Sequence, residues 1–171
     1  SDVSRAVFEA PMQAGRNLCI ELPTEDLTPA DRKRDLVGYL VQSLYGTRGA
    51  AANFQKEVTK TMRRIGFEVG KYNPCTYHHA GKDCICLVHG DDFVTCGSRQ
   101  GCDWLKGKLQ NRFEIKTKVI GNGEGEVTED RILNRVIRIT PHGWELEADQ
   151  RHADIMIEQL NLKDANGVNP P

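Results

Sequence analysis

The stretch DCICLVHGDDFVTC, residues 83–96, decides the fold of this chain. Apolar residues at Asp83–Val88 and Phe93–Cys96 predict two strands, and the polar tetrad His89–Asp92 between them has the glycine and aspartates of a tight turn. The stretch is therefore expected to form a β-hairpin.

Outside the hairpin the apolar pattern changes to the period of a helix. Phe54, Val58, Met62 and Ile65 recur at steps of three and four, which predicts an amphipathic helix over Ala50–Ile65. We expect a second helix over Arg99–Arg112, a helical turn after Thr28-Pro29 and a last helix capped by Asp149. Further strands are expected at Asp2–Phe8, Asn17–Leu22, Thr76–His79, Glu114–Val119, Arg131–Ile139 and Trp144–Ala148. This order predicts an α+β fold with helices packed against an antiparallel sheet.

Composition excludes several classes of protein. The 171 residues, 39% hydrophobic and 27% charged, suit one ordinary globular domain. No apolar run is long enough to cross a bilayer, and no secretory signal opens the chain, so no membrane partner is expected. The formal net charge of −1 argues against autonomous nucleic-acid binding, although basic residues cluster at Arg32–Arg34, at Arg63-Arg64 and between Lys106 and Lys118. Each cluster is either a solvated face or a binding surface.

The six cysteines do not form a C-x-x-C pair. Cys84 and Cys86 alternate along the expected strand, so they share one face and are expected to pack as small hydrophobic side chains. A zinc site made of Cys75, His78 and His79 is an alternative, although the usual ligand spacing is missing. Reduced thiols in an intracellular compartment are expected.

The doublet Asp91-Asp92 calls for a physical reason, because adjacent carboxylates repel each other. A divalent cation removes this cost, since Mg²⁺ prefers hard oxygen ligands. A doublet on a hairpin, joined by an aspartate from a neighbouring strand, can hold two ions for in-line phosphoryl displacement. The same residues are also ordinary in turns, so both interpretations stay open for the doublet taken alone.

Several segments, in one collinear order over nearly the whole chain, resemble the reverse transcriptase domain of copia-type retrotransposons. Asp2–Phe8 followed by Ile20–Pro23 is similar to the family's first catalytic strand and the strand after it. The other similar segments are Leu44–Arg48 with Ala51 and Phe54, Gly66-Phe67, Asn73–Cys75, Leu87–Asp92 ("Tyr-Val-Asp-Asp" in the family), Arg112–Lys116, Ile132–Ile137 and Asp149–Ala153.

The resemblance implies an RNA-directed DNA polymerase that extends a primer 3′-hydroxyl with deoxynucleotides on an RNA or DNA template. Asp2, Asp91 and Asp92 are expected to be the catalytic residues and the ligands of Mg²⁺ or Mn²⁺, with Asp2 and Asp91 as the principal ligands. The expected substrate contacts are the backbone amides around Val3, Ser4 and Arg5, the side chains Val7 or Phe8, and Gly46 with Arg48 near the template base and nucleotide. Gly46 is equally well explained as a plain turn before the helix.

The chain departs from the family pattern at two places. His89 and Gly90 stand where the family has Tyr and Val, so the turn is more pliable and His89 either perturbs its acidic neighbours or reaches solvent. The aromatic residue that excludes ribonucleotides is expected five residues after the first aspartate, where this chain has Val7. Either the strand is bulged so that Phe8 takes this place, or sugar discrimination is weakened.

The resemblance also implies a domain plan: a palm with partial fingers over residues 1–148, and the start of the thumb or a linker over 149–171. The other fingers, most of the thumb, and the ribonuclease H and integrase regions are expected as partners in a polyprotein, in a cytoplasmic particle or the nucleus. Two other classes stay open. One is a catalytically inactive remnant that acts at most as an interaction domain; the other is a metal-dependent phosphohydrolase, for which His89 is the candidate base.

Overall fold

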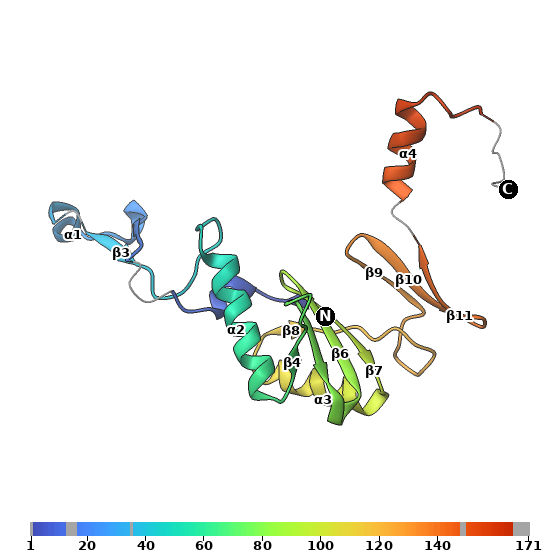
Figure 1. Cartoon of the computed structure of the whole chain (residues 1–171). Helices are drawn as coiled ribbons and strands as arrows, with labels where there is room; N and C mark the ends of the chain where they lie inside the picture. Colours follow the sequence, from blue (N-terminus) through green and yellow to red (C-terminus); the bar gives the residue numbers. More distant parts are fainter. Residues whose placement is uncertain (1, 13–16, 35, 148–149, 166–171) are drawn as a thin grey trace. The chain divides into compact units, whose positions relative to one another are not determined.

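The computed structural model describes residues 2–12, 17–34, 36–147 and 150–165 (Figure 1). The chain divides into two compact units, Ser1–Thr117 and Lys118–Pro171. This division lies earlier than the expected boundary at Ala148 and Asp149, two residues that lie outside the described ranges, because a three-stranded sheet forms within the second unit. The assignment of palm and thumb stays a prediction.

A six-stranded sheet forms the centre of the first unit, with the strand order β4-β5-β6-β7-β1-β8. All its neighbouring strands are antiparallel, so the expected α+β class is confirmed. The strands are β1 (Asp2–Val3), β4 (Glu68–Val69), β5 (Thr76–His79), β6 (Cys84–His89), β7 (Asp92–Gly97) and β8 (Ile115–Lys116).

The predicted hairpin is confirmed as β6 and β7. These strands pair from Cys84 opposite Gly97 to His89 opposite Asp92, which leaves a loop of only Gly90 and Asp91. Gly90 has a φ of 62°, and a two-residue hairpin loop with a positive φ at its first position suits a glycine there. Gly90, which stands where the resembling family has Val, is therefore the residue that the turn geometry favours.

Two helices, α2 (Ala50–Arg64) and α3 (Arg99–Gln110), cover one face of this sheet (Figure 1). Both agree with the predicted helices within two residues at each end. Buried side chains of both helices join those of the sheet in one core cluster: Val3, Phe54, Val58, Met62, Tyr77, Cys84, Cys86, Val88, Phe93, Leu105, Leu109 and Phe113, among others. Cys84 and Cys86 are packed in this core, as expected. The residues that alternate with these core residues along β6 and β7 belong to the other, open face of the sheet.

The expected strand over Asp2–Phe8 is wrong beyond Val3. The backbone of Arg5 is left-handed, with φ 54°, and Ala6–Glu9 forms a 3₁₀ helix. The amide of Phe8 donates to the carbonyl of Arg5 at 2.9 Å, and the amide of Ala10 donates to that of Val7 at 3.2 Å. The apolar run has the composition of a strand, but it buries Ala6, Val7 and Ala10 by coiling instead.

A short two-stranded sheet follows along the chain. It pairs β2 (Cys19–Glu21), the middle of the strand expected at Asn17–Leu22, with β3 (Val37–Tyr39), which was not expected. The helical turn expected after Thr28-Pro29 is confirmed as α1 (Pro29–Lys33), where Thr28 and Asp31 form a capping box. Two further 3₁₀ helices cover Thr24–Asp26 and Ala80–Lys82.

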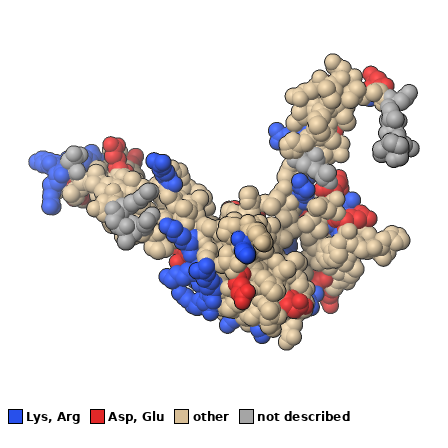
Figure 2. All heavy atoms as spheres, viewed as in Figure 1, with Lys and Arg blue, Asp and Glu red and all other residues tan. Residues whose placement is uncertain are grey.

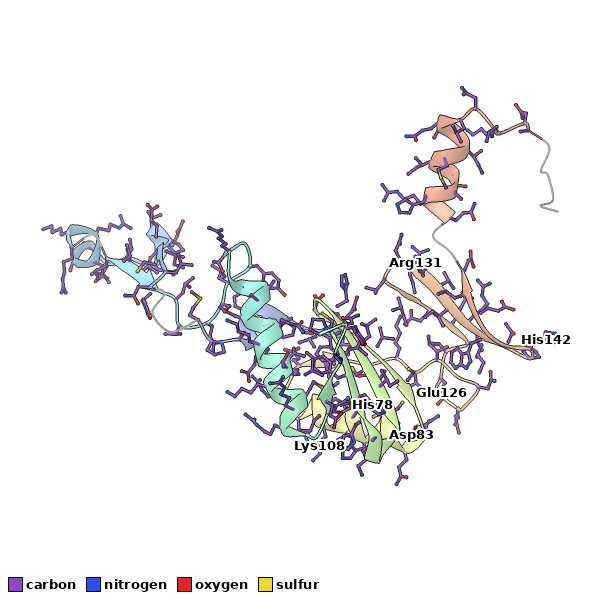
Figure 3. The ribbon with its side chains drawn as sticks, in the orientation of Figure 1. His78, Asp83, Lys108, Glu126, Arg131 and His142 are labelled. Carbon is purple, nitrogen blue, oxygen red and sulfur yellow. The ribbon has the colours of Figure 1, made fainter. Side chains whose placement is uncertain are left out.

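The second unit contains an antiparallel sheet in the order β11-β10-β9 and a helix. Its elements are β9 (Glu129–Ile132), β10 (Arg135–Thr140), β11 (Gly143–Glu147) and α4 (Gln150–Gln159). The single strand expected over Arg131–Ile139 is wrong, because Leu133 and Asn134 both have positive φ and turn the chain between β9 and β10. His142 lies in the turn between β10 and β11 (Figure 3).

Among the described residues, no helix combines the length and the apolar content that a membrane crossing requires.

Candidate active site on the open face of the sheet

Four polar residues stand in register across β6, β7, β1 and β8. His89 pairs with Asp92, Asp92 with Asp2, and Asp2 with Lys116. Directly opposed residues of antiparallel strands point to the same face, so these four side chains form one line, here called the carboxylate row. All four are exposed or half-buried, on the face that the helices leave open. The expectation that Asp2 lies on a strand next to the Asp91-Asp92 turn is thus confirmed.

The opposite face of the same strands holds the row in place. Val3 follows Asp2, Phe93 follows Asp92 and Val88 precedes His89, and each of these three side chains is only 1% exposed. A slip of one residue would bring the row into the core and these apolar side chains into water, so the register is strongly specified. The amide of Val3 also donates to the carbonyl of Asp91 at 3.1 Å, which joins β1 to the hairpin loop.

The donor set suits a hard cation in its chemistry. Asp2 and Asp92 present two carboxylates from adjacent strands, and Asp91 adds a third from the loop beside them. Within the described ranges, however, no three side chains of His, Cys, Asp or Glu are grouped closely enough to hold an ion. The register also places Asp92, rather than the expected principal ligand Asp91, opposite Asp2. The ligand roles of all three stay predictions.

The amides expected to face a triphosphate are partly occupied. Val3 donates its amide hydrogen to Asp91, as described above, and Ser4 donates to the carbonyl of Glu114 at 2.8 Å. These two amides are therefore not available to an anion, and the expectation is corrected for them. The amide expected at Arg5 lies in the left-handed turn after β1. A left-handed backbone at a residue other than glycine is strained, and such residues are often found at functional sites.

Phe8, and not Val7, is the aromatic side chain that reaches the surface. Val7 is 9% exposed and packs inward, whereas Phe8 is 41% exposed and contacts the ring of Tyr45 edge-on, with 5.6 Å between ring centroids. The bulged strand that the sequence suggested is wrong in its form, because a 3₁₀ helix carries both residues. The exposure of Phe8 agrees with the expectation that Phe8, and not Val7, is the aromatic residue facing the nucleotide sugar.

Gly46 and Arg48 lie in the turn before α2, outside the carboxylate row. The amide of Thr47 donates to the carbonyl of Leu44 at 3.1 Å, and Gly46, at the third position of that turn, has a φ of 82°. This φ explains the glycine as a turn residue. No atom lies within 4 Å of where a Cβ at Gly46 would stand, so its surface is also open. Arg48 lines a hollow of about 250 Å³ together with Met12, Asn17, Leu18, Thr47, Gly49 and Asn53.

Arg112 ties the turn after β1 to both helices. It follows α3, and its guanidinium donates to Glu9 Oε2 at 2.9 Å, to the carbonyl of Glu9 at 3.2 Å and to Glu57 Oε1 of α2 at 3.1 Å. Burial lowers the pKa of Arg112, but the hydrogen bonds to Glu57 and Glu9 outweigh it, so its pKa is raised and the guanidinium stays charged. This network fixes the 3₁₀ helix that carries Phe8.

The two histidines of the zinc alternative lie on opposite faces of β5. His78 pairs with Ile85 on the open face (Figure 3), and His79 pairs with Cys84 on the helix face. His79 contacts the rings of Phe67 and Trp104, each at 5.2 Å between centroids. Neighbouring residues of one strand point to opposite faces, so these histidines cannot bind one ion together.

The sequence alone does not reveal the place of Lys116 in the row. It identifies Lys116 only as one member of a basic cluster, because its partner Asp2 is more than a hundred residues away in the chain. A short strand such as β8 carries no apolar period from which such a partner could be found.

The chain was compared with protein-family models, with curated proteins and with solved structures, and none of the three comparisons gave a match.

Proposed function

We propose that this chain is the palm core of an RNA-directed DNA polymerase of the copia type, in which Asp2, Asp91 and Asp92 carry the nucleotidyl-transfer site. The observation that supports it best is the pairing of Asp2 with Asp92. Asp2 lies on the strand next to the hairpin that carries Asp91 and Asp92, although some ninety residues separate it from them in the chain. The collinear order of the resembling segments supports the same assignment.

In this proposal the sheet supplies position and charge. Asp2 and Asp92 would hold Mg²⁺ or Mn²⁺ with support from Asp91. The bound ion would supply the charge neutralisation that phosphoryl transfer to a 3′-hydroxyl needs. Lys116, opposite Asp2, offsets part of the negative charge of the row. Phe8 would contact the sugar of the incoming nucleotide.

Primer extension on an RNA template tests the proposal, with Mg²⁺ and with Mn²⁺. We expect Asp92→Asn to lower extension by at least about 100-fold, because the site loses a charged oxygen ligand. Asp83→Asn is the matched control, because it makes the same chemical change at the far end of β6 (Figure 3). Asp83 has a left-handed backbone, which asparagine also adopts readily. Equal extension by the wild type and Asp92→Asn would exclude the assignment.

A catalytically inactive interaction domain is the second candidate. It is favoured by the formal net charge of −1, because proteins that grip a phosphate backbone usually carry a basic excess. This candidate predicts that neither Mg²⁺ nor Mn²⁺ binds at the row. The two candidates therefore differ in a binding measurement that needs no turnover.

One observation favours the phosphohydrolase: His89, its candidate base, is paired with Asp92 across β6 and β7. It predicts metal-dependent hydrolysis of an activated phosphodiester that is lost in His89→Gln. The polymerase proposal predicts that the same variant keeps primer extension within a few-fold, because it gives His89 no proton to transfer.

A further inference from the structure

Four cations line the solvent side of α2. Lys56, Lys60, Arg63 and Arg64 are all exposed, Lys60 with 65% of its side chain. Their spacing of four, three and one residues places them within an arc of about 100° on the helix surface, over a length of roughly 12 Å. These four residues are called the α2 stripe, and Figure 2 shows Lys and Arg atoms gathered over this part of the first unit.

The α2 stripe points away from the sheet. The opposite side of the helix carries Phe54, Val58 and Met62, which are buried in the core. The carboxylate row belongs to the sheet face that the helices do not cover. The sheet therefore lies between the row and the stripe, and a ligand on the stripe is not a ligand of the row.

The charge of the stripe is left almost uncompensated. Glu57 is the only acidic residue of α2, and Arg112 holds it on the inner side, where its side chain is 12% exposed. Lys60 lies 3.8 Å from Glu57 Oε2. Across the described ranges no other ion pair involves a residue of the stripe.

The helix dipole favours only half of the stripe. Cations in the last turn of a helix interact favourably with its dipole, which accounts for Arg63 and Arg64. Lys56 and Lys60 lie in the middle of α2, where this effect has faded. The helix dipole therefore does not account for these two lysines.

We propose that the α2 stripe binds the phosphate backbone of nucleic acid, at a second site separate from the carboxylate row. Cations aligned along one side of a rigid helix suit a polyanion without reading its bases. An anionic membrane fits less well, because the neighbours Ala52, which is exposed, and Gln55, which is half-buried, are not the large apolar residues that insert into lipid. The choice of nucleic acid among acidic polymers rests on the proposed function; the anion site itself does not.

The test is fluorescence anisotropy of the whole chain with a labelled single strand of about 12 nucleotides, in EDTA, between about 50 and 200 mM salt. The fourfold variant Lys56→Gln, Lys60→Gln, Arg63→Gln and Arg64→Gln is expected to bind at least about 10-fold more weakly at the lowest salt. The slope of log K against log salt is expected to fall by about 3, at roughly 0.7 for each phosphate that the protein no longer neutralises.

A control variant changes the net charge equally at exposed cations elsewhere: Lys33→Gln, Arg34→Gln, Lys108→Gln (Figure 3) and Arg135→Gln. It is expected to keep its affinity within about twofold. An equal loss of affinity in the two variants, or no loss in the stripe variant, overturns the proposal. Tighter binding to polyglutamate or to anionic vesicles than to the oligonucleotide overturns the choice of partner.

A variant that adds charge keeps the test independent of folding defects. Ala52 is exposed one turn before Lys56, so Ala52→Lys extends the stripe and is expected to steepen the salt slope by roughly 0.7. An unchanged slope in Ala52→Lys counts against the site. EDTA and the Asp92→Asn variant separate the two proposals. Binding to the stripe should persist in EDTA and in Asp92→Asn, because neither changes the stripe. Its presence or loss therefore does not test the polymerase proposal.

Discussion

The carboxylate row places two like charges directly opposite each other, an arrangement that lowers the stability of the fold. Asp2 and Asp92 are paired in antiparallel register, where opposed like charges are destabilising, and only Asp2 has a cation, Lys116, on its other side. The other features of this region all favour the observed fold: the apolar alternation along the strands, the two-residue loop and the buried residues beneath the row. A local conflict in an otherwise consistent region is typical of a functional site.

This conflict predicts a stability change that requires no activity. In the absence of divalent cations, Asp92→Asn should raise the free energy of unfolding by roughly 0.2–1 kcal/mol, because it removes one of the opposed charges. Urea unfolding at neutral pH measures this change. The control Asp83→Asn should leave the free energy of unfolding within experimental error. A clear destabilisation by Asp92→Asn would mean that its charge is compensated in the fold.

Phe8 offers a second prediction at this scale, which rests on the proposed function. Phe8→Ala should raise the incorporation of ribonucleotides relative to deoxynucleotides by at least about 10-fold, since the exposed ring no longer blocks the 2′-hydroxyl. Val7→Ala should instead lower the free energy of unfolding by roughly 1–2 kcal/mol and leave the ratio unchanged, because Val7 is in the core. Single-nucleotide incorporation assays measure both ratios. A change of the ratio in Val7→Ala alone would reverse the two roles.

At the scale of elements, the sequence predicted the helices and strands that carry their own apolar periodicity. The helix from Ala50 and the β6–β7 hairpin were predicted because each contains its own apolar repeat and its own turn or cap residue. The strand order was not predictable, since β1 joins β7 and β8 through contacts that span most of the first unit. The run from Ala6 to Glu9 was misread because strand composition and a buried 3₁₀ helix share the same apolar residues.

The buried cysteines of β6 give an element-scale prediction with a pH dependence. Burial raises the pKa of the Cys86 thiol to about 11, so it stays protonated where an unfolded thiol already ionises. The folded state then binds more protons, and stability should fall as the pH rises from about 9 towards about 11. Urea unfolding across this range measures the fall, which Cys86→Ala should reduce.

At a pH of about 8, iodoacetamide should label the exposed Cys19 and Cys96 but not Cys86. Rapid labelling of Cys86 in the native state would contradict this assignment.

At the scale of the whole molecule, stability is concentrated in the first unit. Every buried residue of the described ranges belongs to Ser1–Thr117, and none belongs to Lys118–Pro171. The second unit also exposes many apolar side chains for its length, among them Trp144, Leu146 and Leu160. Domain boundaries were hard to infer from the sequence, because the strands of both units carry similar apolar patterns.

This asymmetry predicts the behaviour of the separated parts. Residues 1–117 alone should unfold cooperatively, because they contain the complete core cluster. Residues 118–171 alone should show no cooperative transition, because they bury too little apolar surface to offset chain entropy. Circular dichroism during thermal unfolding measures both. A sharp transition in the second fragment, or its loss in the first, would show that the core is distributed differently.

The central claim is that Asp2 and the Asp91-Asp92 turn form one divalent-cation site, and Mn²⁺ titration followed by nuclear magnetic resonance tests it most directly. The account predicts that substoichiometric Mn²⁺ broadens first the amide signals of β1 and of the β6–β7 turn, and that Asp92→Asn removes this effect while Asp83→Asn does not. Broadening that begins elsewhere, or that is the same in Asp92→Asn, would contradict the account.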